Sequence, residues 1–199
     1  MDRPKRPRPA PSPPVATELR IIGGDLRGRK VEYHGDSRTR PMKDRVREAV
    51  FNLIEPKAKY AIDLFGGTGA LGLEAVSRGA VGALFIERHF PTARLIEQNA
   101  KQLGIDDQCR VFPGSAFVWV RRPDAPTDAP WLVFCSPPYD FYVSRAAEML
   151  DLLERMQAAA PAGSTFVVES DNRFDPATLP QPHAWDTRIY PPAYISVLR

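Results

Sequence analysis

Short apolar runs alternate with longer amphipathic stretches through the middle of the chain. In chain order, the pattern predicts a strand at 61–65, a helix at 69–78, a strand at 81–86, a helix at 91–103, and strands at 109–112 and 131–135. Short, nearly continuous apolar runs are typical of strands that are buried on both faces. The alternation therefore predicts an α/β fold with a parallel, doubly wound sheet and right-handed crossovers. Ligands of such sheets bind at the carboxyl ends of the strands.

Two patterned segments precede this sheet. Residues 19–22 and 30–33 form short apolar or alternating runs joined through glycines, which predicts a β-hairpin. An amphipathic helix follows the hairpin and ends at Pro56. Its apolar stripe comprises Val46, Val50, Leu53 and Ile54.

The C-terminal part completes the sheet. We expect a helix at 144–160, a strand at 165–170 and, after a proline-rich connection, a closing strand at 194–198. We expect a mostly parallel, seven-stranded sheet with an antiparallel edge and an N-terminal β-hairpin extension, and the apolar runs locate six of its seven strands. The sequence then divides into a basic, proline-rich, disordered tail (1–17), a hairpin-and-helix extension (18–56) and a main domain (57–199).

The turn after the first strand of the sheet carries the first candidate chemistry. Gly67, Gly69 and Gly72 satisfy the pattern G-x-G-x-x-G, and Glu87 closes the next predicted strand as an acceptor for ribose hydroxyls. Asp63, in the strand before the turn, favours S-adenosylmethionine over a dinucleotide, because its carboxylate can face the cofactor's ammonium group directly or through water. A pyrophosphate would instead prefer backbone donors at a helix N-terminus. A glycine-rich turn without a ligand is the alternative.

A second candidate site follows the strand at 131–135. The two prolines Pro137 and Pro138 stiffen the exit of this strand, so that Ser136, the Pro137 carbonyl group and the Tyr139 ring face the ligand crevice. The serine oxygen and the carbonyl oxygen can accept hydrogen bonds from an exocyclic amine, and the tyrosine can stack on a planar base. The loop therefore indicates an amine on a nucleobase as the substrate.

Composition and length set limits on the class of protein. The chain has 199 residues, of which 43% are hydrophobic, which is enough for one sizeable core. It shows neither an apolar run that could cross a membrane nor a signal peptide, so we expect a soluble, cytoplasmic protein. Cys109 and Cys135 are too few for a disulfide framework, and the three histidines lack the spacing of metal ligands, so we predict no metal site.

Positive charge is concentrated at the N-terminal end. Residues 1–50 hold 13 Lys/Arg against 7 Asp/Glu, or +6, whereas the remaining residues hold 14 against 17, or −3. This asymmetry predicts that the N-terminal part contacts a polyanion, with RNA or DNA as the leading candidates, although a solvated basic surface is the alternative. The predicted RNA-binding residues are Arg20, Arg27, Arg29, Lys30, Arg40, Lys43, Arg45 and Arg47.

Four motifs together resemble a known family. The segments RIIGGDLRGRK, RPMKDRVREAVFN, DLFGGTGALGLEA and SPPY, in this order and spacing, resemble the bacterial 16S rRNA guanine-N2 methyltransferases of the RsmD family. The resemblance implies a Rossmann-like S-adenosylmethionine-dependent methyltransferase fold and methylation of the exocyclic N2 amine of one guanine in 16S rRNA. It also implies an assembling small ribosomal subunit as the partner, and we expect the enzyme to act as a monomer.

The resemblance assigns roles to residues. Pro137, Pro138 and Tyr139 match the target-base loop, and Arg45 and Arg47 match the family's basic helix. The cofactor-binding residues that we predict are Asp63, Phe65, Gly66, Gly67, Thr68, Gly69, Glu87, Arg88, Ser115 and Ala116.

The sequence departs from the family pattern at two positions. Ser136 and Ser115 both stand where the family usually has Asp or Asn. A neutral acceptor at position 136 orients an amine less strongly than a carboxylate does. Three alternatives therefore stay open: a DNA amino-methyltransferase, a noncatalytic RNA-binding or ribosome-assembly factor that retains the fold, and, more distantly, an NAD-dependent oxidoreductase.

Overall fold

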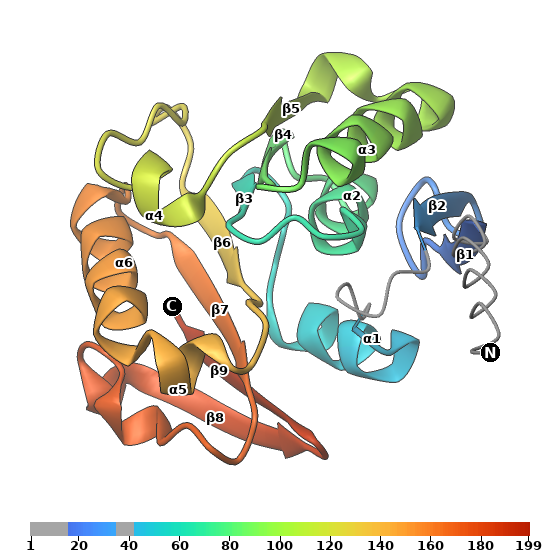
Figure 1. Ribbon diagram of the computed structural model, residues 1–199. Coiled ribbons are helices and arrows are strands. Elements are labelled where there is room, and N and C mark those ends of the chain that lie inside the picture. The colour runs from blue at the N-terminus through green and yellow to red at the C-terminus, as the bar shows by residue number, and fades with distance from the viewer. Residues whose placement is uncertain (1–15, 35–41) are drawn as a thin grey trace, which may run out of the picture.

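A sheet of seven strands forms the centre of the computed structural model, which describes residues 16–34 and 42–199 (Figure 1). The strands are β3 (Tyr60–Asp63), β4 (Gly82–Ile86), β5 (Cys109–Phe112), β6 (Trp131–Cys135), β7 (Thr165–Ser170), β8 (Trp185–Tyr190) and β9 (Ala193–Leu198). They lie in the order β5-β4-β3-β6-β7-β9-β8. Strands β3 to β7 pair in parallel, whereas β9 runs antiparallel to both β7 and β8. The predicted mostly parallel sheet with an antiparallel edge is confirmed.

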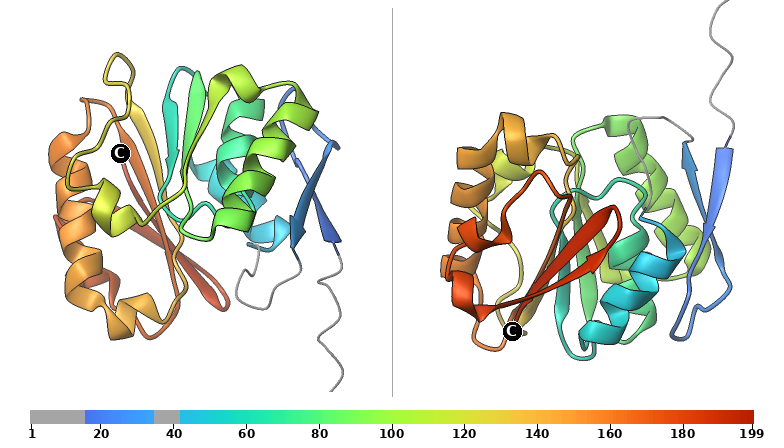
Figure 2. Two further views of the ribbon diagram at one scale, coloured as in Figure 1. Left: turned by 45° about the horizontal axis from the view of Figure 1, so that its top comes forward. Right: turned by 90° about the horizontal axis from the view of Figure 1, so that it is seen from below.

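Helices cover both faces of this sheet (Figure 2). On one face lie α1 (Asp44–Leu53), α2 (Ala70–Ser77) and α3 (Phe90–Leu103), and on the other lie α4 (Ala116–Trp119), α5 (Phe141–Ser144) and α6 (Ala146–Ala159). Three 3-10 turns, η1 (Asp106–Gln108), η2 (Pro176–Thr178) and η3 (Pro182–Ala184), complete the connections.

The two helical layers create two apolar cores. Successive side chains of a strand point to opposite faces, so Ala61 packs with Phe51 and Leu73 in one core, while Ile62 packs with Leu152 in the other. Every residue of β4, β6 and β7 is buried. This double burial explains why these strands are apolar runs rather than alternating ones.

The predicted N-terminal hairpin is present as the antiparallel pair β1 (Ala16–Arg20) and β2 (Lys30–His34). It packs against the same core as α2, because Ile21 and Val31 are buried there. Buried polar groups also hold it. Both backbone amides of Ile22 and Gly23 donate to the Glu74 carboxylate at 2.7 Å. The hairpin is therefore fixed to the sheet domain rather than free.

Three elements of the structure were not predicted from the sequence. The helix predicted at 144–160 corresponds to α6, whereas the short helices α4 and α5 were not predicted. Arg145, which lies outside helical geometry (φ −136°, ψ 31°), separates α5 from α6. Strand β8 was not predicted. It is an edge strand whose residues are exposed or partly buried, so it lacks the apolar run that marks the central strands. Residues 1–15 of the predicted disordered tail lie outside the described residues, whereas Ala16 and Thr17 belong to β1, so the prediction is wrong for these two residues. None of the helices in 16–34 and 42–199 combines the length and apolar character that crossing a bilayer requires.

Candidate active site

A cavity of about 760 Å³ opens where β3, β4, β6 and β7 end. This is the edge at which parallel α/β sheets bind ligands, and the volume is in the range of roughly 300–1,000 Å³ that small-molecule sites span. The predicted residues that line it are Asp63, Phe65, Gly66, Gly67, Thr68, Glu87, Arg88, Ser115, Ala116, Ser136, Pro137, Pro138 and Tyr139. The fold thus brings the two candidate sites of the sequence into one cavity.

The glycine turn owes its shape to two left-handed residues. Gly67 and Gly69 have φ angles of 51° and 75°, which residues other than glycine rarely adopt. Gly69 does not line the cavity but turns the chain directly into α2. The Gly69 amide donates to the Gly66 carbonyl oxygen at 2.6 Å, which closes the turn.

Glu87 supports the turn from the neighbouring strand. Its carboxylate accepts hydrogen bonds from the backbone amides of Gly67 (2.9 Å) and His89 (2.7 Å). A carboxylate offers about four lone-pair positions, so two amides leave room for two further donors such as ribose hydroxyls. The position of Glu87 after β4 agrees with the role that the sequence predicts.

Asp63 is the most perturbed acid of the cavity. Burial raises the pKa of its carboxyl group from 3.8 to about 8, helped by the nearby Glu87 carboxylate, while the backbone amides of Phe65 and Gly72 act in the opposite direction. Its Oδ1 atom is buried and has no hydrogen-bond partner among the described residues. An ammonium group in the cavity would supply both a donor for this oxygen and the charge that the carboxylate lacks. The residues present therefore fit the amino-acid end of S-adenosylmethionine.

The loop after β6 is bound to an acid that sequence reasoning did not identify. The Ser136 hydroxyl and the Tyr139 hydroxyl both donate to the carboxylate of Glu169, the latter at 2.6 Å. Glu169 lies near the end of β7, is 7% exposed and lines the cavity. A signal was available, since Glu169 is a charged residue directly after the apolar run at 166–168, within a segment that the sequence already assigns to a strand of the sheet.

Burial and the Glu169 carboxylate raise the pKa of Tyr139. The phenol therefore stays protonated and keeps donating to Glu169 across the physiological range of pH. Its ring is held in the cavity wall by this bond, and Pro137 beside it is buried.

An aromatic wall, which was only partly predicted, lines another side of the cavity. The rings of Phe65, Phe117 and Phe141 lie 5.9–6.1 Å from one another. The guanidinium of Arg145 lies over Phe117 at 3.9 Å, within reach of a cation–π interaction. These residues follow β3, start α4 and α5, and are distant in sequence, so only Phe65 could be connected with the site before the structure was known.

The predicted RNA-binding residues separate into exposed and buried members. The side chains exposed to solvent are those of Arg20, Arg27, Arg29, Lys30, Lys43 and Arg45. Lys43 also lines the cavity. Arg40 lies outside the described residues.

Arg47 is a correction to the sequence prediction. It is 1% exposed, and its guanidinium donates to the Arg20 carbonyl oxygen (2.6 Å) and to Asp44 Oδ1 (3.1 Å). Position 47 precedes Val50 and Phe51 by three and four residues, which puts it on the buried face of α1. Arg47 thus anchors α1 to the hairpin and cannot contact RNA in this fold.

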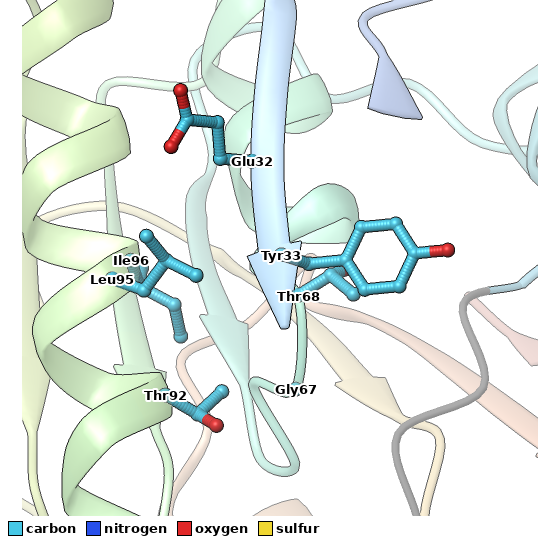
Figure 3. A pocket seen from close by; sticks show the side chains of 7 residues that line it. All are labelled: Glu32, Tyr33, Gly67, Thr68, Thr92, Leu95 and Ile96. Atoms are coloured by element: carbon cyan, nitrogen blue, oxygen red, sulfur yellow. The ribbon is translucent and has the colours of Figure 1, made fainter. Parts of the chain in front are cut away.

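The hairpin also reaches the glycine turn. At the end of β2, Glu32 and Tyr33 line a small cavity together with Gly67 and Thr68 of the turn and with α3 residues (Figure 3). The Glu32 backbone is held there by Asn99, whose side chain accepts from its amide (3.0 Å) and donates to its carbonyl oxygen (2.7 Å). The basic extension and the predicted cofactor site are therefore direct neighbours.

Comparison with known sequences identifies relatives over most of the chain. A family model described as Conserved hypothetical protein 95 matches residues 19–190. The ribosomal RNA small subunit methyltransferase D of Escherichia coli (strain K12) is 37% identical over 139 residues, which is 69% of this chain and 67% of that protein. The protein of the same name from Haemophilus influenzae is 32% identical over 139 residues, or 68% and 72% of the two chains.

Solved structures agree with this relationship. A structure from Escherichia coli named as a methyltransferase, yhhF, superposes with a TM-score of 0.75 and 31% identity, covering 91% of this chain and 97% of that one. An RNA methyltransferase from Salinibacter ruber in complex with S-adenosyl-L-homocysteine has the same fold, with a TM-score of 0.60 and 17% identity over 80% and 92% of the chains. The predicted Rossmann-like methyltransferase fold is confirmed. The chain belongs to the family of the ribosomal RNA small subunit methyltransferase D proteins, described as Conserved hypothetical protein 95.

Proposed function

We propose that the protein transfers a methyl group from S-adenosylmethionine to the exocyclic N2 amine of a guanine in the 16S rRNA of the small ribosomal subunit. One observation carries the proposal: the turn with Asp63 and the loop at Ser136–Tyr139 face the same cavity. A cofactor held by the turn and an amine held by the loop would then meet inside one enclosed volume. Membership of the methyltransferase D family supports the same reaction.

The cofactor would be held at both ends by acids. Asp63 would bind the ammonium group, and Glu87 would accept hydrogen bonds from the ribose hydroxyls, since its carboxylate is already fixed by two backbone amides. The aromatic wall formed by Phe65, Phe117 and Phe141 would offer apolar contact to the adenine. When bound, S-adenosylmethionine supplies an electrophilic methyl group on a positively charged sulfur.

The target amine would be oriented by the loop after β6. The guanine amine is a poor nucleophile because its lone pair is delocalised into the ring. Hydrogen bonds from the amine to Ser136 Oγ and to the Pro137 carbonyl oxygen would turn this lone pair toward the methyl group, and Tyr139 would stack on the base. Positioning of this kind accelerates a reaction by removing the cost of bringing two partners into alignment. The base must be unpaired or flipped out of its stack to reach the cavity.

The RNA would approach across the basic extension. The exposed side chains of Arg20, Arg27, Arg29, Lys30, Lys43 and Arg45 offer positive charge to phosphates, and Lys43 lies at the cavity itself. We propose that an assembling small-subunit particle is the substrate and that the enzyme acts on it as a monomer.

The test is methyl transfer from radiolabelled S-adenosylmethionine to small subunits that lack the modification, followed by nucleoside analysis of the RNA. We expect N2-methylguanosine as the product and little transfer to subunits that already carry it. Naked rRNA and double-stranded DNA serve as parallel substrates. Transfer to DNA would favour a DNA amino-methyltransferase instead. Cofactor binding without transfer to particles, RNA or DNA would overturn the proposal in favour of a noncatalytic factor.

A further inference from the structure

Glu169 of β7 brings a carboxylate next to the loop after β6, which has no acidic side chain at position 136. Family members usually carry Asp or Asn at position 136, and this chain carries a serine. In the structure the Ser136 hydroxyl donates to the Glu169 carboxylate, which belongs to the neighbouring strand β7. A carboxylate is therefore one hydrogen bond away from the position at which the target amine would be held.

The direction of this hydrogen bond matters for chemistry. Because the Ser136 proton points to Glu169, the lone pairs of Ser136 Oγ are left to accept a hydrogen bond from an amine. A hydroxyl that donates to a carboxylate is polarised and becomes a better acceptor, as occurs in chains of hydrogen bonds in a low-dielectric site. The pair can thus act on an amine more strongly than an isolated serine can.

We propose that Ser136 and Glu169 form a hydroxyl–carboxylate pair that takes over the task of the missing side-chain acid or amide in the methyl transfer proposed above. Ser136 touches the amine, and Glu169 positions Ser136 and accepts the Ser136 proton before it passes to solvent. The amine nitrogen gives its lone pair to the methyl carbon, and the carbon–sulfur bond breaks with its electrons going to sulfur. The surplus proton of the methylated nitrogen moves to Ser136 Oγ as the Ser136 proton moves to Glu169. Glu169 then returns a proton to solvent.

The surroundings of Glu169 support this role. The residue is 7% exposed, yet it lines the cavity, so its carboxylate is shielded from bulk water and reachable from the site. Its other oxygen accepts from Tyr139 at 2.6 Å, which fixes the carboxylate and the stacking ring in one arrangement. A second interpretation is that Glu169 only anchors Tyr139, and the experiment must separate the two.

The experiment compares four variants in single-turnover methyl transfer to unmodified small subunits. Glu169→Gln keeps the shape but removes the charge, and we expect the rate of transfer to fall by about 10²-fold or more, as loss of proton transfer does in other enzymes. Tyr139→Phe removes only the anchor bond and keeps the charge of Glu169, and we expect a smaller loss of about tenfold, which corresponds to the lower end of the range for a hydrogen bond to a charged group. Glu154→Gln, the same change on the exposed surface of α6, should leave the rate unchanged.

The fourth variant tests replacement directly. In Ser136→Asp combined with Glu169→Gln, the carboxylate moves to position 136 and the amide at 169 can donate to it. We expect this double variant to regain at least tenfold of the rate that Glu169→Gln loses, whereas a merely structural Glu169 would give no recovery. Cofactor affinity, particle affinity and the thermal midpoint are measured for every variant, and they should stay within about twofold or a few degrees of the original protein.

The outcomes distinguish this inference from the function on which it rests. Absence of methyl transfer by the unaltered protein overturns the proposed function. Normal transfer by the unaltered protein, with equal losses in Glu169→Gln and Tyr139→Phe and no recovery in the double variant, overturns only the hydroxyl–carboxylate pair. The hydroxyl–carboxylate pair is also overturned if the Glu169→Gln variant binds the cofactor and transfers methyl groups at the original rate.

Discussion

At the scale of single residues, Asp63 couples the cofactor to protons. Its raised pKa of about 8 means that the carboxyl group is protonated in the empty cavity at neutral pH. A cationic ammonium favours the carboxylate, so binding of S-adenosylmethionine at pH 6.5 should release close to one proton. Titration calorimetry in buffers of different ionisation enthalpy measures this number. Asp63→Asn, which cannot titrate, should bind more weakly and release almost none. Equal release in both proteins would contradict this role of Asp63.

The same shift affects stability without a cofactor. Because the pKa of Asp63 is raised in the folded state above its usual 3.8, the neutral form favours folding and the charged form opposes it. This contribution is fully present below about pH 4 and is lost as the pH rises through about 8. The free energy of unfolding of Asp63→Asn should therefore decline less over this window, which urea titrations at pH 5 and pH 8 can measure.

Tyr139 offers a second prediction at this scale. Stacking of a base on an aromatic side chain contributes about 1–3 kcal/mol, so Tyr139→Ala should lower kcat/KM for the particle by about 10- to 100-fold. Cofactor affinity should stay nearly constant, because the ring belongs to the loop after β6 and not to the glycine turn. Turnover assays with equilibrium binding of the cofactor check both parts, and normal turnover in this variant would refute the stacking role.

At the scale of elements, the buried polar anchors of the hairpin determine its attachment. Glu74 is 0% exposed and accepts from two hairpin amides and from Arg78 Nε (2.8 Å). Glu74→Ala leaves these donors buried without an acceptor, so we expect the free energy of unfolding to drop by about 3–5 kcal/mol. Glu48→Ala, an exposed change on α1, should cost less than about 0.5 kcal/mol. Chemical denaturation of both variants measures the difference.

Helix α1 supplies a matched pair of arginines for a further test. Arg45 is exposed, whereas Arg47 is buried against the hairpin. Arg45→Ala should weaken binding of small subunits and reduce the salt dependence of that binding by about one phosphate contact, with stability unchanged. Arg47→Ala should instead lower the free energy of unfolding by about 3 kcal/mol, because the buried Glu74 carboxylate, 3.9 Å from Arg47 Nε, loses a counter-charge. Filter binding measures the affinity for small subunits, and thermal melts measure stability. Loss of stability in Arg45→Ala with loss of binding alone in Arg47→Ala would contradict these roles.

Elements with strong local signals could be predicted from the sequence. The strand at 131–135 and the strand at 165–170 agree with β6 and β7 at both ends, because their apolar runs are bounded by prolines or polar residues. Strand β8 could not be predicted, because an edge strand with one exposed face shows no such run. The helices α4 and α5 could not be predicted either, because four residues are too few to show a helical period.

The candidate site also contains residues that the sequence could identify and residues that it could not. Residues within one motif, such as those of the glycine turn and the loop at Ser136–Tyr139, could be assigned before the structure was known. Glu169 and the aromatic partners Phe117 and Phe141 could not, because their meaning depends on contacts between elements that are far apart in sequence. The prediction for Arg47 was wrong for a different reason. We expected an arginine in a basic segment to be exposed, but its position on α1 faces the core and its side chain is buried.

At the scale of the whole molecule, binding of the ribosomal particle and binding of S-adenosylmethionine should differ in their dependence on salt. The described basic side chains of the extension would make about five phosphate contacts, so raising the salt from 50 to 200 mM should weaken particle binding by about 500-fold. The affinity for S-adenosylmethionine, which rests on enclosed contacts, should change by less than about twofold over the same range. Parallel binding isotherms measure both, and a salt-insensitive particle affinity would exclude a phosphate-binding role for the extension.

Among the described residues, the wall of the cavity extends along the chain from Met42 before α1 to Ala193 in β9. Arg199 joins these two regions through its hydrogen bond to the Leu53 carbonyl oxygen (2.8 Å). A ribosome that makes this chain therefore releases the glycine turn long before the last part of the wall. While β8 and β9 are still untranslated, the nascent protein holds the signature motifs but not a closed cavity. We therefore expect methylating activity to appear only after β9 has been synthesised.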